Sequence, residues 1–268
     1  MINHISFPNL GWEFEINRIA FSVFGMPVYL YGVIIALGLL LAFLYGVYEA
    51  KRVGLSQDDL LNMLLIGIPA AIVCARAYYV AFEWDSYKNN LAEIFNIRGG
   101  GIAIYGAVIG VAVSVFFYCR TKKLNMGKVL DLLAVGLLIG QSIGRWGNFV
   151  NGEAFGVSCN LPWAMTIVNE GRTVAEMAHP TFFYESLWNG LGLVVLLLFR
   201  KHKAFEGEVF CGYMIWYGIG RMFIEGLRTD SLYIGIFRVS QLLSGVLVVV
   251  GIILIVINRK NLKKTLDK

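Results

Sequence analysis

Charged residues are scarce in this sequence. Asp, Glu, Lys and Arg make up 15% of the 268 residues, whereas a soluble domain carries about 25%. Hydrophobic residues make up 57%, the mean hydropathy is +0.66, and long apolar runs recur along the whole length. These features exclude a soluble domain with one membrane anchor, and they predict a polytopic membrane protein.

Histidine and cysteine are also rare. The four cysteines, Cys74, Cys119, Cys159 and Cys211, show no C-x-x-C spacing, and three of them lie in apolar runs, so we expect free thiols and no metal site. All three histidines lie outside the apolar runs, which argues against an intramembrane serine protease. The N-terminal part lacks a charged region followed by a short apolar segment and a cleavage site, so we expect no removable signal peptide.

Seven apolar segments are long enough to cross a membrane as helices. They cover residues 27–48, 60–82, 102–119, 129–150, 181–199, 209–226 and 235–257. Seven spans put the two termini on opposite sides, and Lys and Arg are concentrated in the loops on the C-terminal side, which places that side in the cytoplasm. The sequence therefore predicts an all-α polytopic membrane protein with seven transmembrane helices. We expect one transmembrane domain over residues 1–268, an outer N-terminus, and a basic cytoplasmic tail over residues 258–268.

Two segments are too polar to be spans. Residues 1–26 are mixed polar and aromatic, and we expect them at the membrane interface. Residues 151–180 are polar and rich in Gly and Pro, which predicts a small extracytoplasmic head between the fourth and fifth helices. The net charge of +5 falls mostly in the cytoplasmic loops, so it does not indicate a nucleic-acid partner.

The most informative stretch is residues 141–153, which read Q-S-I-G-R-W-G-N-F-V-N-G-E. On a helix, Gln141, Arg145 and Asn148 share one face because they are spaced by four and three residues. Gly136, Gly140 and Gly144 form an adjoining stripe that lets another helix approach closely. An arginine in an apolar segment costs roughly 2.5–3.5 kcal/mol at the bilayer centre. The convergence of polar groups around Arg145 therefore predicts a site; its further members are Asn151 and Glu153.

Polar residues of the other expected spans lie at the same depth. With the predicted topology, the outer half of the membrane contains Tyr31, Arg76, Arg98, Tyr105, Arg145, Tyr217, Arg221, Glu225, Arg228 and Arg238. A structural ion pair, such as Arg221 with Glu225, would explain why any one of these charged residues is present. It does not explain why all of them lie at the same depth. Arginine binds phosphate oxygens bidentately and keeps its charge, so the cluster indicates an anionic phospholipid headgroup. Candidate proton acceptors or orienting groups nearby are Glu153, Glu185, Glu225 and His179.

Three segments resemble a known family. Residues 144–153 read G-R-W-G-N-F-V-N-G-E and resemble the signature G-R-x-G-N-F-x-N-x-E of the bacterial prolipoprotein diacylglyceryl transferases. Residues 179–185 resemble that family's H-P-x-x-x-Y-E, and residues 217–228 resemble its Y-G-x-x-R-x-x-x-E-x-x-R. Tyr31-Gly32 and Arg76 also match, so the resemblance covers essentially the whole chain.

The resemblance implies a transferase that moves the diacylglyceryl group of phosphatidylglycerol to the lipobox cysteine thiol of prolipoprotein signal peptides. The products are a thioether and glycerol 1-phosphate, and the reaction is the first step of bacterial lipoprotein maturation. No metal or organic cofactor is implied. The implied location is the bacterial cytoplasmic membrane, with the active site facing the outer leaflet. Residues 1–26 and 151–180 are then candidates for holding the signal peptide.

The resemblance also assigns residues to the site. It places Arg145 and Asn148 at the phosphatidylglycerol site and Arg221 with Glu225 near the reacting headgroup. The other expected contacts of this lipid are Tyr31, Arg76, Gln141, Asn151, Glu153, Tyr217 and Arg228. A positive field lowers the pKa of a thiol from about 8.5 and stabilises a departing phosphate, so we expect catalytic roles for Arg145 and Arg221.

The catalytic base is left open. Many relatives have a histidine in a G-G-x-x-x-H-G segment, whereas residues 100–106 read G-G-I-A-I-Y-G, with Tyr105 in that place. The role of base does not carry over to Tyr105, because a phenol with a pKa of about 10 is a poor base at neutral pH. The alternatives are Tyr105, His179, Glu153 and no base at all.

An anion transporter or channel is the main alternative function, because it also uses intramembrane arginines. The charged residues stop in the outer half, however, and the sequence shows no charged path to the inner face. A retinal protein is disfavoured because residues 235–257 contain no lysine for a Schiff base. A purely structural membrane protein would need neither the arginines nor their alignment.

Overall fold

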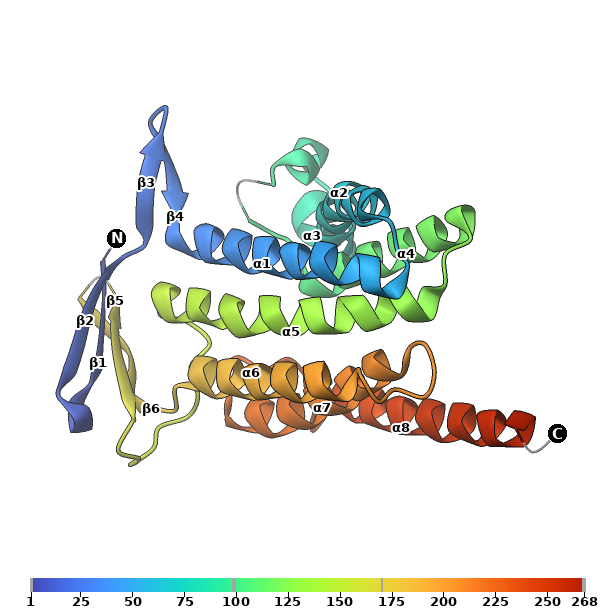
Figure 1. Ribbon diagram of the computed structural model, residues 1–268. Coiled ribbons are helices and arrows are strands. Elements are labelled where there is room, and N and C mark those ends of the chain that lie inside the picture. Colours follow the sequence, from blue (N-terminus) through green and yellow to red (C-terminus); the bar gives the residue numbers. More distant parts are fainter. Residues whose placement is uncertain (1, 98–99, 170, 267–268) are drawn as a thin grey trace. The chain divides into compact units, whose positions relative to one another are not determined.

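Helices make up most of the computed structural model, which describes residues 2–97, 100–169 and 171–266 (Figure 1). The long helices are α1 (Leu30–Val53), α2 (Gln57–Phe82), α4 (Ile104–Lys122), α5 (Met126–Asn151), α6 (Thr181–Phe199), α7 (Glu208–Leu227) and α8 (Val239–Leu266). The short helices are η1 (Pro8–Leu10), α3 (Trp84–Tyr87) and η2 (Leu91–Phe95). Arg98, which we expected at the outer start of the third span, lies outside the described residues.

Each predicted span overlaps a long helix, but residues 27–29 and 235–238 precede α1 and α8. Within the described ranges, six helices are long and apolar enough to cross a membrane, namely α1, α2, α4, α5, α6 and α8. Their outer faces expose large apolar side chains such as Val73, Val108 and Leu198, as expected where lipid replaces water as the solvent. The chain is therefore a multi-pass membrane protein, whereas a crossing by α7 stays a prediction.

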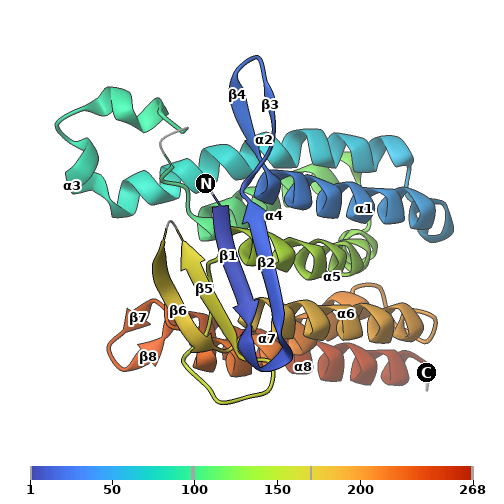
Figure 2. The same cartoon turned by 90° about the vertical axis from the view of Figure 1, so that its left-hand side faces the viewer.

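The all-α expectation needs a correction, because the chain also contains an antiparallel sheet. Figure 2 shows its four strands in the order β2-β1-β5-β6. The strands β1 (Ile2–Phe7) and β2 (Trp12–Asn17) precede the helices, whereas β5 (Met165–Asn169) and β6 (Arg172–Ala178) lie between α5 and α6. β1 pairs with β5 from Asn3 opposite Asn169 to Ser6 opposite Thr166. The expected interfacial segment and the expected head thus fold together.

The sheet has its own apolar core next to the helices. Ile5 and Ile167 are buried on one face and pack with Phe182, in the first turn of α6. Alternation along the strands places these side chains on the same face of the sheet. Asn3 is buried, and its Nδ2 donates to the carbonyl of Val150 at 2.8 Å. The sheet is therefore fixed to the ends of α5 and α6 that carry the predicted site.

Two hairpins account for the remaining strands. β3 (Ile19–Val23) pairs with β4 (Met26–Tyr29) just before α1, and β7 (Tyr233–Ile234) pairs with β8 (Phe237–Arg238) between α7 and α8. The backbone amide of Leu30 donates to the carbonyl of Arg18 at 2.8 Å. This bond fixes the first hairpin at the beginning of α1.

The described chain divides into two compact units, residues 1–46 with 130–268 and residues 47–129. In the first unit, α6, α7 and α8 lie side by side (Figure 1), and the predicted glycine stripe of α5 contacts α1. A Cβ on Gly144 would lie 3.2 Å from Ile35, and one on Gly38 would lie 3.5 Å from the Cα of Gly140. In the second unit, α2 and α4 pack closely at Gly110, where a Cβ would lie 2.5 Å from the Ala70 carbonyl oxygen.

Candidate active site

The candidate site lies between α5, α6 and α7, near the ends that carry the sheet. Its central group is the Glu185 carboxylate on α6, a residue that is 3% exposed. Oε1 of Glu185 accepts a hydrogen bond from Nη2 of Arg145 at 2.5 Å, and Oε2 lies 3.1 Å from Nη1 of Arg221. One carboxylate thus bridges two arginines that come from two other helices. We call Arg145, Glu185 and Arg221 the arginine layer.

Arg221 makes a second ion pair within its own helix. Its Nη2 lies 2.6 Å from Oε2 of Glu225, one helical turn further along α7, so the two residues share one helical face, as predicted. Glu225 is 2% exposed, and its backbone carbonyl accepts a hydrogen bond from Nη1 of Arg238. A buried carboxylate without a partner is costly, so these arginines and carboxylates stabilise one another.

The other branch of the network runs through the sequence signature. Nη1 of Arg145 donates to Oδ1 of Asn148 at 3.0 Å, and Nδ2 of Asn148 donates to Oε1 of Glu153 at 3.0 Å. The same oxygen accepts from Nδ2 of Asn151 at 3.2 Å. The predicted common face of Arg145 and Asn148 is therefore confirmed. The signature residues form a hydrogen-bonded chain that orients the Arg145 guanidinium.

The two arginines of the layer remain accessible to an anion. Their side chains are 23% exposed for Arg145 and 14% exposed for Arg221. A guanidinium carries five N–H donors, and among the described residues Arg145 directs one donor of Nη1 to Asn148 and one of Nη2 to Glu185. Donors for a phosphate or carboxylate therefore remain on a group that is already oriented.

A reciprocal pair of hydrogen bonds joins α5 to α6 beside Glu185. Oγ of Ser142 donates to the carbonyl of Ser186 at 2.9 Å, and Oγ of Ser186 donates to the carbonyl of Ser142 at 2.8 Å. Residues 140–144 read G-Q-S-I-G, which has the spacing of a serine hydrolase motif. Ser142 lies inside α5, however, and not on a strand-to-helix turn, so the structure gives it no nucleophile geometry.

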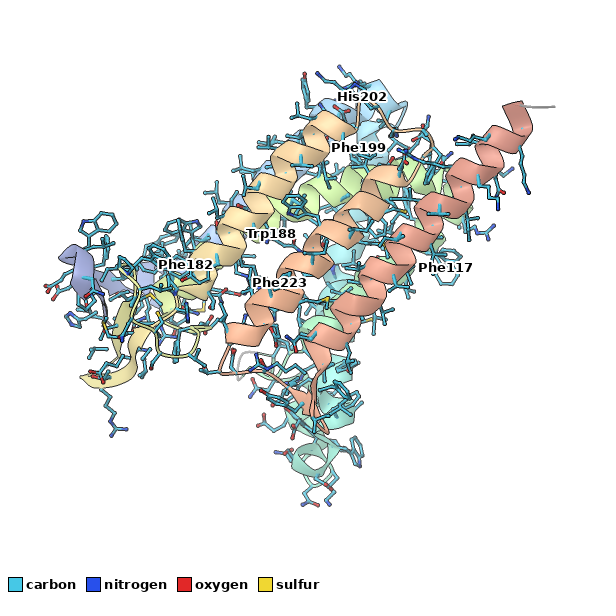
Figure 3. The ribbon with its side chains drawn as sticks, turned by 90° about the horizontal axis from the view of Figure 1, so that it is seen from below. Phe117, Phe182, Trp188, Phe199, His202 and Phe223 are labelled. Carbon is cyan, nitrogen blue, oxygen red and sulfur yellow. The ribbon has the colours of Figure 1, made fainter. Side chains whose placement is uncertain are left out.

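A second reciprocal pair, the tryptophan clasp, joins α6 to α7. Nε1 of Trp188 donates to the carbonyl of Trp216, and Nε1 of Trp216 donates to the carbonyl of Trp188, both at 2.9 Å. The two indoles stack with ring centroids 4.6 Å apart, and Figure 3 labels Trp188 where α6 approaches α7. A Cβ on Gly192 or Gly220 would collide with the opposite indole. The clasp therefore holds Glu185 and Arg221 at a fixed separation.

The clasp also has a sequence signal that our sequence analysis missed. Residues 188–192 read W-N-G-L-G, and residues 216–220 read W-Y-G-I-G. The same spacing of tryptophan and glycine on two neighbouring helices predicts a symmetric contact. Sequence reasoning also named Glu185 only as a candidate proton acceptor or orienting group and did not assign it to the lipid or catalytic site. Its signal is that it is the one charged residue among residues 181–199.

Three other predicted lipid contacts lie on these helices or pack against them. The ring of Tyr31 packs on α5 at Gly147, where a Cβ would lie 2.6 Å from Cδ2 of the tyrosine. Nε2 of Gln141 donates to the hydroxyl of Tyr213 at 2.8 Å. The ring of Tyr217 stacks on that of Tyr213 at 5.6 Å. The structure therefore brings Gln141 and Tyr217 to one aromatic group below the arginine layer.

Arg228 and His179 have partners outside the arginine layer. Arg228 makes a bidentate contact with Asp230, from Nε to Oδ1 at 2.9 Å and from Nη2 to Oδ2 at 2.7 Å. Hydrogen bonding from Arg228 lowers the pKa of Asp230. Nδ1 of His179 lies 3.2 Å from the hydroxyl of Tyr184, which accepts from Nε1 of Trp163 at 2.7 Å. His179 thus belongs to a contact between the sheet segment and α6.

Arg76 and Tyr105 lie in the second unit. Arg76 is 6% exposed and donates to four backbone carbonyls, those of Glu93, Ile94, Gly100 and Gly101, at 2.6–2.8 Å. It therefore orders the segment before α4, and its predicted lipid contact stays a prediction. Tyr105 lies in the first turn of α4, with its ring 6.3 Å from that of Tyr78.

Side chains that could bind a metal are scattered over the described part of the chain. Within these ranges, no group of three or more His, Cys, Asp and Glu side chains is placed to hold a metal ion. The four cysteines are free thiols, as expected, and Cys119 and Cys211 are buried.

Comparisons with known proteins give one consistent answer. The family model described as prolipoprotein diacylglyceryl transferase matches residues 18–257. The chain is 47% identical over 246 residues to the phosphatidylglycerol–prolipoprotein diacylglyceryl transferase of Clostridioides difficile, covering 91% of this chain and 97% of that protein. The enzyme of the same name from Finegoldia magna is 47% identical over 253 residues, covering 94% and 100%. The one from Enterococcus faecalis is 48% identical over 256 residues, covering 92% of both chains.

Proposed function

Because the chain belongs to the prolipoprotein diacylglyceryl transferase family, we propose that its arginine layer binds the phosphate of phosphatidylglycerol during transfer to a lipobox cysteine. The chain is a transferase of lipoprotein biosynthesis. It moves the diacylglyceryl group of phosphatidylglycerol to prolipoproteins in the first step of their maturation.

The bridging of Arg145 and Arg221 by Glu185 is the observation that carries the proposal. Both guanidiniums point at the two oxygens of one buried carboxylate. A phosphodiester also carries one negative charge, and its free oxygens accept hydrogen bonds from arginine in the same manner. The lipid phosphate therefore competes with Glu185 for the two arginines and takes the place of its carboxylate.

The reaction is a displacement at the glyceryl carbon that bears the phosphate. The cysteine sulfur forms the new C–S bond, the C–O bond to the phosphate breaks, and glycerol 1-phosphate leaves with the bonding electron pair. The thiol gives up its proton before or during this step, to the base or, without a base, to the departing phosphate. Arg145 and Arg221 stabilise the negative charge that grows on the leaving phosphate, and their field raises the fraction of thiolate.

The remaining predicted residues support this layer or extend it. Asn148, Asn151 and Glu153 orient Arg145, and Glu225 orients Arg221. The further lipid contacts that we propose are Tyr31, Arg76, Gln141, Tyr217 and Arg228. The base stays open among Tyr105, His179, Glu153 and no base.

We propose seven crossings, with α7 as the sixth in chain order, and a site that faces the outer leaflet of the cytoplasmic membrane. The polar residues of α7 in the site pair with Glu185 and with one another, which lowers the cost of placing them in a membrane. Basic residues such as Arg200, Lys203 and Arg259 lie at the other end of the helices, so the positive-inside rule supports a cytoplasmic location for that end. The four-stranded sheet then lies on the outer side of the membrane.

The test is mass spectrometry of a synthetic lipobox peptide incubated with the purified protein and phosphatidylglycerol. We expect the cysteine to gain the mass of one diacylglyceryl group, and a peptide with serine in place of that cysteine to stay unmodified. No modification by a folded protein that binds phosphatidylglycerol would contradict the proposed transfer.

A further inference from the structure

Two buried amides lie one helical turn below the arginine layer. Asn189 is 1% exposed, and within the described residues neither its Oδ1 nor its Nδ2 has a hydrogen-bond partner. Oε1 of Gln141 is likewise buried without a partner there, whereas its Nε2 donates to Tyr213. Buried amides are almost always hydrogen-bonded, so these orphan groups need an explanation. We call Gln141 and Asn189 the amide layer.

Helix geometry places the amide layer directly next to the arginine layer. Asn189 follows Glu185 by four residues on α6, and Gln141 precedes Arg145 by four residues on α5, so each shares the face of its neighbour. The hydrogen bond from Gln141 to Tyr213 brings α5 and α7 together at this level. One helical turn is about 5.4 Å, and this turn leads away from the sheet, into the apolar part of the helices.

The two layers differ in the ligand chemistry that they favour. The arginine layer offers charged donors, which suit a phosphate. In the amide layer, the donor left without a partner among the described residues is Nδ2 of Asn189, whereas Nε2 of Gln141 already donates to Tyr213. A neutral donor on an apolar helix suits a neutral ligand with a carbonyl oxygen. A diacylglyceryl phospholipid contains both parts in this order, because its two ester groups lie a few bonds from the phosphate on the side of the acyl chains.

We propose that the amide layer binds an ester carbonyl oxygen of the diacylglyceryl group, with Nδ2 of Asn189 as the donor. This inference rests on the proposed function, because it needs the lipid phosphate in the arginine layer. Asn189 is then a substrate-binding residue, and Gln141 holds Tyr213 beside it. The contact aligns the glyceryl carbon for attack, since it fixes the lipid on both sides of the bond to be broken.

The experiment compares two lipids that differ only at the esters. Ordinary diacyl phosphatidylglycerol and its dialkyl ether analogue share the phosphate, the headgroup and the reacting carbon, but the ether analogue lacks the carbonyl oxygens. We expect kcat/KM of the wild type to be about tenfold lower with the ether lipid, which corresponds to about 1.4 kcal/mol. Asn189→Leu, which keeps the branched shape and the number of side-chain heavy atoms but has no donor, should reduce this preference to near unity.

Two controls separate the contact from intrinsic reactivity and from a loss of fold. Asn258→Leu makes the same substitution on α8, where Nδ2 of Asn258 donates to the carbonyl of Leu254 at 2.8 Å, and it should keep the wild-type preference. An intrinsic difference in reactivity between the two lipids would remain in Asn189→Leu. The thermal midpoint of Asn189→Leu should not fall, because leucine replaces an amide that has no partner in the protein.

Equal use of both lipids by the wild type would overturn the ester contact and leave the transferase function intact. That comparison needs no variant to fold. A preference for the diacyl lipid that persists in Asn189→Leu would also overturn it. Absence of transfer from either lipid would overturn the proposed function and the ester contact together.

Discussion

Buried carboxylates lie near both ends of α6 and α7, and their partners differ. Near the end of α6 and the beginning of α7, Asp131 of α5 accepts from the backbone amides of Gly207 and Phe210, both at 3.0 Å, and from Nζ of Lys203 at 2.9 Å. Glu208 is fully buried, accepts from the amide of Ala204 at 2.5 Å and pairs with Nε of Arg259 at 2.5 Å. We call this the capped end.

The two ends differ in whether the partners of the carboxylate can change position. At the capped end, Asp131 is bound to backbone amides at the N-terminus of α7, where the helix dipole also favours negative charge. Glu208 is bound to the backbone amide of Ala204, in the loop before α7. In the arginine layer, the hydrogen-bond partners of the Glu185 carboxylate among the described residues are the side chains of Arg145 and Arg221. Side chains can change partners without unwinding a helix, whereas backbone amides cannot. The comparison indicates that the capped end stabilises the fold and that the arginine layer is free to exchange its carboxylate for a ligand.

The largest expected effect is the loss of transfer in Arg145→Ala. This change removes one of two phosphate-binding guanidiniums, and we expect kcat/KM to fall roughly 100- to 1,000-fold, as for removal of one oxyanion donor. The protein should still insert into the membrane. Peptide modification measured by mass spectrometry, with membrane fractionation as the control, checks both points. Wild-type turnover by a well-inserted Arg145→Ala protein would remove Arg145 from the mechanism.

A matched pair of substitutions sharpens the comparison of the two ends. Glu208→Gln should lower the free energy of unfolding by about 2 kcal/mol, because it removes the charge from a buried ion pair. The loss is limited because glutamine keeps one hydrogen-bond acceptor and because the Arg259 side chain is half-exposed. Transfer per folded molecule should stay unchanged. Glu185→Gln should instead raise the affinity for phosphatidylglycerol severalfold, because the competing negative charge is gone.

Thermal unfolding in detergent and lipid binding to both variants are the measurements for this pair. Equal losses of stability and no change in lipid affinity would show that the two carboxylates have the same role.

A substitution in the tryptophan clasp should have a smaller effect on the same site. Trp188→Phe keeps an aromatic ring but removes the N–H that donates to the carbonyl of Trp216. We expect a loss of about 1 kcal/mol in stability and about a tenfold lower kcat at unchanged KM, since small displacements of catalytic groups slow the chemical step. Trp84→Phe, at an exposed indole, is the control. A changed KM with unchanged kcat would contradict a positioning role.

The smallest expected effect is that of Tyr105→Phe. A phenol is a poor base at neutral pH, so we expect the same dependence of kcat/KM on pH in the variant and the wild type. The measurement is the rate of peptide modification from acidic to basic pH. A profile that loses one limb in the variant would assign a proton-transfer role to the Tyr105 hydroxyl.

The helices and the contacts within single helices of the site could be predicted because their signals are local. Apolar runs of span length locate all the long helices, and spacings of three and four residues predict the contact of Arg145 with Asn148 and the pair of Arg221 with Glu225. These contacts lie within one helix, so periodicity alone determines which side chains can meet.

The sheet and the role of Glu185 could not be predicted in the same way. β1 pairs with β5 across more than a hundred residues of sequence, as Asn3 opposite Asn169 shows, and both segments are short and mixed in polarity. Glu185 gains its role only from Arg145 and Arg221 on two other helices. No local pattern determines which of several carboxylates will meet those guanidiniums.

The decisive measurement is a structure of the protein with phosphatidylglycerol bound. We expect the lipid phosphate within hydrogen-bond distance of both Arg145 and Arg221, with the Glu185 carboxylate no longer bridging them. A bound lipid whose phosphate lies elsewhere, with Glu185 still between the two arginines, would contradict the exchange of carboxylate for phosphate on which the proposed mechanism rests.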